Sequence, residues 1–247
     1  MKLAVIADIH GNREAFAACL EHARERGAEH FALLGDYVGY GADPGWVIDR
    51  VRELVDAGAR AVLGNHDLAV LEAPSPYMNP DARAVIAWTR EELDEDQLAL
   101  LGSLPDTESE GDCLFVHANA AAPRQWRYMH RAEDAARSLQ ATDASYVFCG
   151  HAHEPSAFRL SPDGGILHFK PGAGMSIHLT PGQRWLVVAG AAGQPRDGNP
   201  AASYVMFDRS AAMLTFHRVP YDHETAATKI MAAGLPYRLA LRLIEGI

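Results

Sequence analysis

Five short apolar runs in the first 150 residues are each followed by side chains that can bind a metal ion. In chain order these side chains are Asp8 and His10, Asp36, Asn65, His117, and His151 and His153. In an open α/β sheet, ligands bind in the crevice beyond the carboxyl ends of the strands. These nitrogen and oxygen donors would therefore meet at one place if the strands share a sheet. The spacing predicts a metal site at that edge.

The separate motifs differ in strength. Taken singly, Asp8, Asp36 and Asn65 are as typical of turns and helix caps as of metal sites. His151 and His153 are more specific, because side chains two residues apart in an extended segment point the same way and can face neighbouring metal ions. Together, in this order and each at a strand end, the residues favour a metal site over a set of unrelated turns.

The elements that must position these residues alternate between strand and helix. After the first run, apolar spacing predicts a helix over 13–26, closed by Gly27, and a strand over 30–34. A helix over 46–55 and a strand over 59–63 follow. A βαβαβ order implies parallel strands joined by right-handed crossovers.

An insertion with a helical pattern interrupts this order. It spans residues near 74–105, and we expect helices over 81–92 and 94–101 within it. The chain then returns to strand, helix and strand over 113–116, 132–139 and 145–149. The insertion is too well patterned to be disordered.

The remainder of the chain has a different pattern of predicted secondary structure. Gly, Pro and Asp turns separate short strands over 166–170, 184–189, 203–207 and 214–219, which predicts antiparallel hairpins. A helix over 224–233 and a short C-terminal segment complete the chain. We therefore expect an α/β fold with one domain over 1–247, in which two packed mixed β-sheets are flanked by helices as a four-layer αββα sandwich.

Composition limits the classes of function. The chain is 48% hydrophobic and 22% charged, which is typical of a soluble globular protein, and no apolar stretch approaches the roughly 20 residues of a membrane-spanning helix. The first apolar run ends at Asp8 and is too short for a secretory signal, so we expect a cytoplasmic protein. A net charge of −10 argues against stable nucleic-acid binding. It does not exclude a small phosphorylated substrate, because bound metal ions dominate the local charge.

The three cysteines do not suggest a disulfide framework. Cys19, Cys113 and Cys149 are odd in number and widely spaced. We expect free thiols that pack as small hydrophobic side chains in a reducing compartment.

These motifs resemble those of the calcineurin-like metallophosphoesterase superfamily. The matching order is Asp-x-His at 8–10, Gly-Asp at 35–36, Gly-Asn-His-Asp at 64–67, a lone His117, and Gly-His-x-His at 150–153. The segments 8–12, 35–41 and 193–197 are further similar to a bacterial branch described as diadenosine-tetraphosphatase-like. The resemblance covers nearly the whole chain and implies the αββα fold of that superfamily.

The resemblance implies two bound metal ions. Asp8, His10 and His153 would bind the first ion. Asn65, His117 and His151 would bind the second, and Asp36 would bridge both. Oxygen and nitrogen donors without cysteine suit Mn, Fe, Zn, Co or Ni. Two such ions can clamp a phosphate and activate a water molecule as hydroxide. Two divalent ions, the carboxylates of Asp8 and Asp36 and one hydroxide give the site a net charge of about +1, which favours binding of an anion.

His66 has no metal ion in this scheme. The resemblance implies that it protonates the leaving-group oxygen or stabilises charge on the phosphoryl group, as a general acid. The adjacent Asp67 would orient the His66 ring, as carboxylates commonly do for catalytic histidines. His66 and Asp67 are therefore the predicted catalytic residues.

Other residues near these motifs allow two interpretations each. Asn12 is able to contact a substrate phosphate or to cap the first helix. Arg196 is able to pair with a phosphate or to hold its own loop beside Asp197. Trp126 and Tyr128 are able to stack on a base or to pack in the core.

The expected function is that of a dimetal-dependent phosphoesterase. It would hydrolyse a phosphate monoester, a diester or a nucleotide anhydride with metal-activated hydroxide, and its substrate would be a small phosphorylated molecule, including a nucleotide. One alternative is a catalytically silent scaffold with the same fold, which would be expected to lose ligands or His66. Another is a protein phosphatase, which would need an open groove where a nucleotide enzyme needs a closed pocket. Oligomeric state and metal identity are not encoded in these motifs, and membrane association is not expected.

Overall fold

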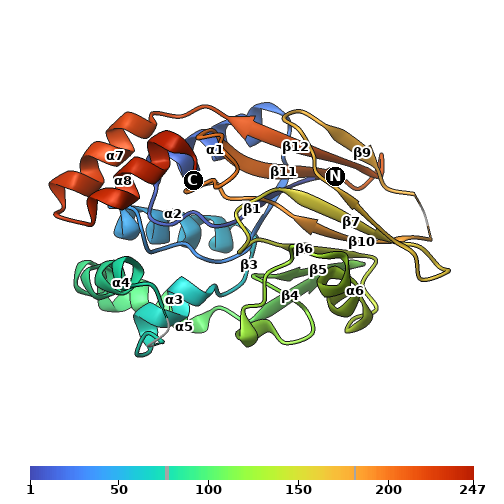
Figure 1. The fold of residues 1–247 in the computed structure, drawn as a ribbon, viewed down its shortest axis with the longest axis horizontal. Helices are drawn as coiled ribbons and strands as arrows, with labels where there is room; N and C mark the ends of the chain where they lie inside the picture. The colour runs from blue at the N-terminus through green and yellow to red at the C-terminus, as the bar shows by residue number, and fades with distance from the viewer. Residues whose placement is uncertain (76–77, 181) are drawn as a thin grey trace.

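Two mixed β-sheets of six strands each form the centre of the molecule (Figure 1). The computed structural model describes residues 1–75, 78–180 and 182–247. The first sheet has the order β3 (Arg60–Ala61), β2 (His30–Leu33), β1 (Lys2–Ile6), β11 (Ala202–Asp208), β12 (Met213–Val219) and β9 (Ser176–His178). The second has the order β4 (Thr107–Glu110), β5 (Cys113–Val116), β6 (Tyr146–Cys149), β10 (Arg184–Val188), β7 (Ser156–Leu160) and β8 (Ile166–Phe169).

Each sheet contains three neighbouring parallel strands. In the first sheet β1, β2 and β3 are parallel, and in the second β5, β6 and β10 are parallel. The remaining pairs are antiparallel. Because parallel strands end at the same edge of a sheet, the segments that follow β1, β2, β5 and β6 start from common edges.

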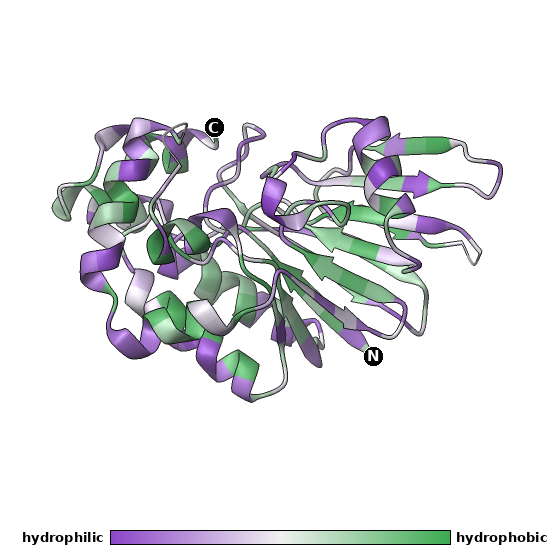
Figure 2. Cartoon of the chain, turned by 90° about the horizontal axis from the view of Figure 1, so that it is seen from below, coloured by the Kyte–Doolittle hydropathy of each residue, from purple (hydrophilic) through white to green (hydrophobic). Residues whose placement is uncertain are grey.

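Alternating side chains divide the core into layers. Leu3 and Val5 of β1 lie in a buried cluster that also contains Phe148 and Val187 of the second sheet, so this cluster fills the space between the sheets. The alternate residues Ala4 and Ile6 pack on the other face, in a cluster shared with helices α1 (Arg13–Glu25) and α2 (Pro44–Asp56). This period of two is the geometry of a strand that is buried on both faces. Figure 2 shows the central strands as mainly hydrophobic, whereas the helices carry both hydrophilic and hydrophobic residues.

Helices cover the outer faces and one end of the sandwich (Figure 1). Their bounds are α1 (Arg13–Glu25), α2 (Pro44–Asp56), α3 (Asn65–Leu71), α4 (Pro80–Glu92), α5 (Glu95–Ser103), α6 (Ala132–Gln140), α7 (His223–Ala232) and α8 (Tyr237–Glu245), with a 3-10 turn at Pro123–Gln125. Helices α1 and α2 pack on the first sheet and α6 on the second. The predicted fold of two packed mixed sheets flanked by helices is confirmed.

Several elements differ from the expectation. The insertion near 74–105 contains α4 and α5 as predicted, although its residues 76 and 77 lie outside the described residues. The strands after residue 153 are not all hairpins, because β10 also pairs in parallel with β6. Helices α3 and α8 and strands β4, β7 and β9 were not expected from the apolar pattern.

The cysteines agree with their expected structural role. Cys19, Cys113 and Cys149 are all buried and free. Cys19 lies in the cluster beneath α1, Cys113 between the sheets, and Cys149 in the cluster under α6. Among the helices of the described residues, none has the length and apolar character that a membrane crossing requires.

Candidate metal centre

The predicted ligands meet where the edges of the two sheets come together. They are contributed by the segments after β1 (Asp8 and His10), β2 (Asp36), β5 (His117) and β6 (His151 and His153), and by the first residue of α3 (Asn65). The expectation of one shared sheet is therefore corrected, because β1 and β2 belong to the first sheet and β5 and β6 to the second. Packing the sheets face to face brings both edges to one site.

The donors form two adjoining groups. His10 Nε2 lies 3.1 Å from His153 Nε2, and His153 Nε2 lies 3.6 Å from Asp8 Oδ1. In the second group, His117 Nε2 lies 3.1 Å from His151 Nδ1 and 3.0 Å from Asn65 Oδ1.

Asp36 lies between the two groups. Its Oδ2 atom is 3.7 Å from His10 Nε2 and 3.4 Å from His117 Nε2. One carboxylate is thus close to a ring nitrogen of each group. This is the position that a bridging ligand requires.

The backbone of these segments is strained. Asp8, His10, Asp36, His151 and His153 all have φ between 51° and 66°, a left-handed conformation that costs free energy for residues other than glycine. Hydrogen bonds between neighbouring segments hold this geometry, including Asp8 N–H to Gly35 O at 3.1 Å and His10 N–H to Asp36 O at 2.9 Å. Strain gathered at one place in a fold is typical of a functional site.

Backbone carbonyls orient the imidazole rings. The Nδ1 atoms of His10, His117 and His153 lie 3.1, 2.7 and 2.6 Å from the carbonyl oxygens of Val38, Leu34 and Gln194. A ring that donates from Nδ1 leaves Nε2 as a lone-pair donor toward the centre. Carbonyl partners of this kind fix the tautomer of metal-binding histidines.

Burial and mutual charge strongly shift the ionisation of the groups in this centre. Burial raises the pKa of Asp8 to about 8, and burial lowers the pKa of His151 to about 3. Burial opposes protonation of His117 as well, but the nearby Asp36 carboxylate raises its pKa to about 9. In the apoprotein a proton on His117 thus offsets the buried carboxylate charge, and a cation held by the same atoms would do so more completely. The donors fit divalent metal ions for this reason.

His66 lies at the edge of the same centre. It is buried, its ring meets that of His10 edge to face at 4.9 Å, and its backbone N–H donates to Asp36 Oδ1 at 2.8 Å. Its Nδ1 atom has no hydrogen-bond partner among the described residues. Gly39 packs against that atom, because a Cβ at Gly39 would lie only 2.5 Å from it.

The expected contact between Asp67 and His66 is not found. Asp67 instead accepts four backbone hydrogen bonds, from Asp36 N at 2.8 Å, Tyr37 N at 2.9 Å, Val38 N at 3.2 Å and Gly64 N at 2.9 Å. Hydrogen bonds from backbone N–H groups to a carboxylate are stronger than hydrogen bonds to a neutral acceptor. Asp67 therefore positions the segment that carries Asp36, which corrects its predicted role as the partner of His66.

Asn12 belongs to the framework of the site. Its Oδ1 accepts from Ala15 N at 3.1 Å and so caps α1, and its Nδ2 donates to Gly193 O at 2.8 Å and to the Tyr221 hydroxyl at 3.1 Å. Because both ends of the amide are used within the protein, the capping interpretation holds and the substrate-contact interpretation of Asn12 is corrected.

Arg196 lies beside the centre without its expected partner. Its Nη2 donates to Gln194 Oε1 at 3.1 Å, its guanidinium lies 5.6 Å from the centre of the Tyr40 ring, and its Nε is buried without a partner among the described residues. Asp197 pairs with Arg218 instead. The positive charge of Arg196 is close enough to contribute to the lowered pKa of His10 and His153, for which burial is the larger cause.

A cavity of about 630 Å³ opens next to the centre. Asn65, His66 and His151 line its inner end. The aromatic side chains Trp126 and Tyr128 line it too, although neither was favoured over a core residue from sequence. Sequence reasoning missed Tyr40, whose ring lies 4.5 Å from His10 and 4.6 Å from His66. Its place between two glycines directly after the Asp36 motif is the signal that would have identified it.

An αββα sandwich with a buried cluster of Asp, Asn and His at the joined edges of its sheets has the architecture of a metallophosphoesterase. The comparison with protein families agrees. Residues 1–212 match the calcineurin-like phosphoesterase superfamily domain, and the chain belongs to that superfamily of phosphoric ester hydrolases.

Similar proteins support the same assignment. An uncharacterized protein of Methanocaldococcus jannaschii is 35% identical over 251 residues, covering 99% of this chain and 98% of the relative. The crystal structure of a metallophosphoesterase from Sphaerobacter thermophilus is 36% identical, with a TM-score of 0.89 over 100% of this chain and 99% of that one. A symmetrical bis(5'-nucleosyl)-tetraphosphatase of Edwardsiella ictaluri is 30% identical over 159 residues, which is 59% of this chain and 52% of the relative.

The four hydrogen bonds of Asp67 lead to a prediction about stability. Asp67→Ala leaves buried N–H groups of the Asp36 segment without acceptors, and we expect it to lower the free energy of unfolding by about 3 kcal/mol or more. Urea denaturation followed by circular dichroism measures this change. Asp96→Ala, at an exposed carboxylate of α5, is the control and should change stability by less than about 0.5 kcal/mol. Equal stability of the two variants would contradict the positioning role.

Proposed function

We propose that this protein is a hydrolase of small phosphate esters or anhydrides that works with two metal ions. Asp8, His10 and His153 would hold one ion, and Asn65, His117 and His151 the other. Asp36 would be shared between them. The observation that carries the proposal is the position of the Asp36 carboxylate, within 3.7 Å of His10 Nε2 and 3.4 Å of His117 Nε2. Manganese, iron, zinc, cobalt and nickel all suit these donors.

When bound, such ions neutralise charge on the phosphoryl group and lower the pKa of a water molecule so that it can attack. The protein's own groups would supply the proton, stabilise the phosphoryl charge and position the ligands. His66 faces Gly39 with Nδ1, so its Nε2 is left to give a proton to the leaving-group oxygen. Arg196 offers a positive charge to the phosphoryl oxygens, and the carbonyls behind the histidine rings hold them in place.

A nucleotide is the substrate class that agrees best with the site. The cavity of about 630 Å³ is large enough for one nucleotide and is bounded by α3 and by α4 of the inserted region, which suits a small molecule better than a protein surface. The relative named bis(5'-nucleosyl)-tetraphosphatase supports the same class. A silent scaffold is disfavoured because all seven proposed ligands and His66 are present and clustered. The predicted cytoplasmic location is part of this proposal.

A substrate panel tests the proposed reaction class. The purified protein with added Mn²⁺ should hydrolyse at least one of p-nitrophenyl phosphate, bis-p-nitrophenyl phosphate, a cyclic nucleotide or a dinucleoside polyphosphate. Activity that disappears with a chelator and returns with the metal is the expected result. A metal-loaded preparation inactive on the whole panel would argue against the proposal.

Asp36→Asn should lose both metal and activity, since an amide carries no charge and cannot balance two cations. Elemental analysis of the purified variant measures the bound metal, and kcat with the best substrate of the panel measures activity. Full metal content in this variant would contradict the shared role of Asp36.

His66→Ala should keep its metal ions and lose most of its turnover. Loss of general acid assistance typically lowers a rate by roughly 10²–10⁴-fold. Elemental analysis and kcat, compared side by side with Asp36→Asn, separate a proton-transfer role from a ligand role. Unchanged kcat would exclude the role as acid, and loss of one metal ion would identify His66 as a ligand.

A further inference from the structure

The cavity beside the metal centre has three kinds of wall. Its inner end is formed by the donors Asn65, His66 and His151. An aromatic wall is formed by Tyr40, Trp126 and Tyr128. The remaining wall comes from α3, α4 and some described residues of the connection between them, and is formed by Leu68, Ala69, Glu72, Ala73, Ser75, Met78, Asn79 and Ala82. Only the inner end therefore offers metal donors to a phosphoryl group.

The rest of the cavity is unsuited to additional phosphates. Glu72 is the one carboxylate among the described lining residues, and these residues include no lysine or arginine. Arg196 lies over the Tyr40 ring but does not line the cavity. A chain of phosphates that extended away from the centre along α3 would meet the Glu72 carboxylate, and the described lining residues offer no lysine or arginine to offset it.

The aromatic wall is suited to a planar, uncharged group. The Tyr128 ring stacks on His151 at 4.2 Å with an interplanar angle of 17° and on His130 at 5.2 Å with an interplanar angle of 10°, and 47% of Tyr128 remains exposed. Trp126 meets His117 edge to face at 5.7 Å. These contacts place both rings against proposed metal ligands, so a partly exposed aromatic surface lies beside the reacting group.

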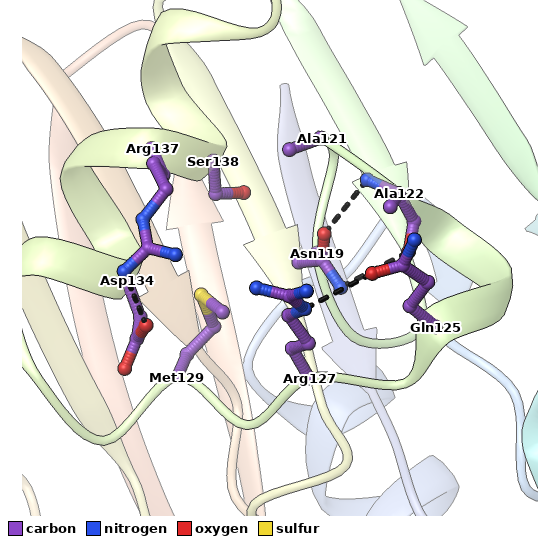
Figure 3. Close-up of a pocket in the computed structure, with 9 residues that line it drawn as sticks. All are labelled: Asn119, Ala121, Ala122, Gln125, Arg127, Met129, Asp134, Arg137 and Ser138. Atoms are coloured by element: carbon purple, nitrogen blue, oxygen red, sulfur yellow. Dashed lines mark hydrogen bonds and ion pairs between the residues drawn. The ribbon is translucent and has the colours of Figure 1, made fainter.

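The segment 125–129 that carries these rings is also supported from behind. Its alternate residues Gln125, Arg127 and Met129 point the other way, into a second cavity of about 220 Å³ between this segment and α6 (Figure 3). There Met129 is buried together with Ala135 and Leu139 of α6. Gln125 and Arg127 are exposed and their side chains hydrogen-bond to each other within the segment, Arg127 Nε donating to Gln125 Oε1 at 3.0 Å. Met129 therefore packs the segment against α6 before a ligand arrives, which lowers the entropic cost of stacking.

We infer that the substrate carries one phosphoryl group joined to an uncharged aromatic moiety such as a nucleoside, and that a polyphosphate chain is disfavoured. This inference rests on the proposed function and narrows it. In the reaction a water oxygen bonds to phosphorus and the phosphorus–oxygen ester bond breaks. The leaving oxygen takes a proton from His66, and the proton lost by the attacking water replaces it through solvent. Trp126 and Tyr128 are the residues that select the aromatic moiety.

A binding series separates the contribution of the base from that of the phosphates. Titration calorimetry of the Mn²⁺-loaded protein, at constant free Mn²⁺, compares inorganic phosphate, AMP, ADP and ATP. We expect AMP to bind at least about tenfold more tightly than phosphate, because stacking of one base on aromatic side chains supplies a gain of that order. ADP and ATP should bind no more tightly than AMP. ATP affinity tenfold above that of AMP would overturn the inference and leave the proposed function standing.

Variants of the aromatic wall test the residues themselves. Trp126→Leu and Tyr128→Leu should each weaken AMP about tenfold and leave the affinity for inorganic phosphate unchanged, whereas Tyr128→Phe should retain AMP binding. Arg127→Leu, on the same segment but facing the second cavity, is the matched control and should change the affinity for neither AMP nor inorganic phosphate. An equal loss of AMP and phosphate affinity would show damage to the metal centre and would contradict the selective role of the rings.

The charge argument has its own variant. Glu72→Lys should improve binding of ADP and ATP relative to AMP at least about fivefold, and Glu72→Gln should give a smaller change in the same direction. If Glu72→Lys leaves the affinity for ADP and ATP unchanged relative to that for AMP, the inference that Glu72 disfavours additional phosphates is wrong. A protein that binds AMP as expected but hydrolyses no phosphate ester would contradict the proposed function instead.

Discussion

The site depends on the hydrogen bonds that Asp67 accepts from the segment after β2. Four backbone N–H groups donate to one buried carboxylate, and three of them belong to Asp36 and the two residues that follow it. Gly64 packs so closely that a Cβ there would lie 2.1 Å from Asp36 N. Because α3 supplies Asp67, Asn65 and His66 from its first turn, the helix that presents two site residues also fixes the position of Asp36.

This arrangement buries several costly groups together. Asp8, Asp36 and Asp67 are at most 1% exposed, and five of the proposed ligands have left-handed backbone. Neither feature favours folding of the apoprotein, since buried carboxylates lose hydration and left-handed residues are strained. The packed core between the sheets has to offset that cost, and bound cations would reduce it. Stability and metal affinity are therefore coupled through the same carboxylates.

The fold and the ligand set could be predicted from sequence because both depend on local order. Apolar runs followed at once by Asp or His give the strands and their ends. The role of Asp67 could not be predicted in this way, because three of its four partners lie some thirty residues earlier and all four are backbone groups. Helix α3 was missed because its first turn is the ligand motif itself, and β4 because Thr107–Glu110 contains no apolar residue. In α8 the spacing of Leu239, Ala240 and Leu243 is amphipathic and would have identified the helix.

The segment 125–129 links ligand geometry to substrate choice. Trp126 meets His117 edge to face and Tyr128 stacks on His151, so this segment lies against two proposed ligands while it presents aromatic side chains to the cavity. On its opposite face Met129 is buried with Ala135 and Leu139 of α6. A change of sequence on the cavity face alters what the site accepts, whereas a change in backbone position alters the ligand itself. Side chains at positions 126 and 128 can therefore change what the cavity accepts while the backbone of the segment stays in place.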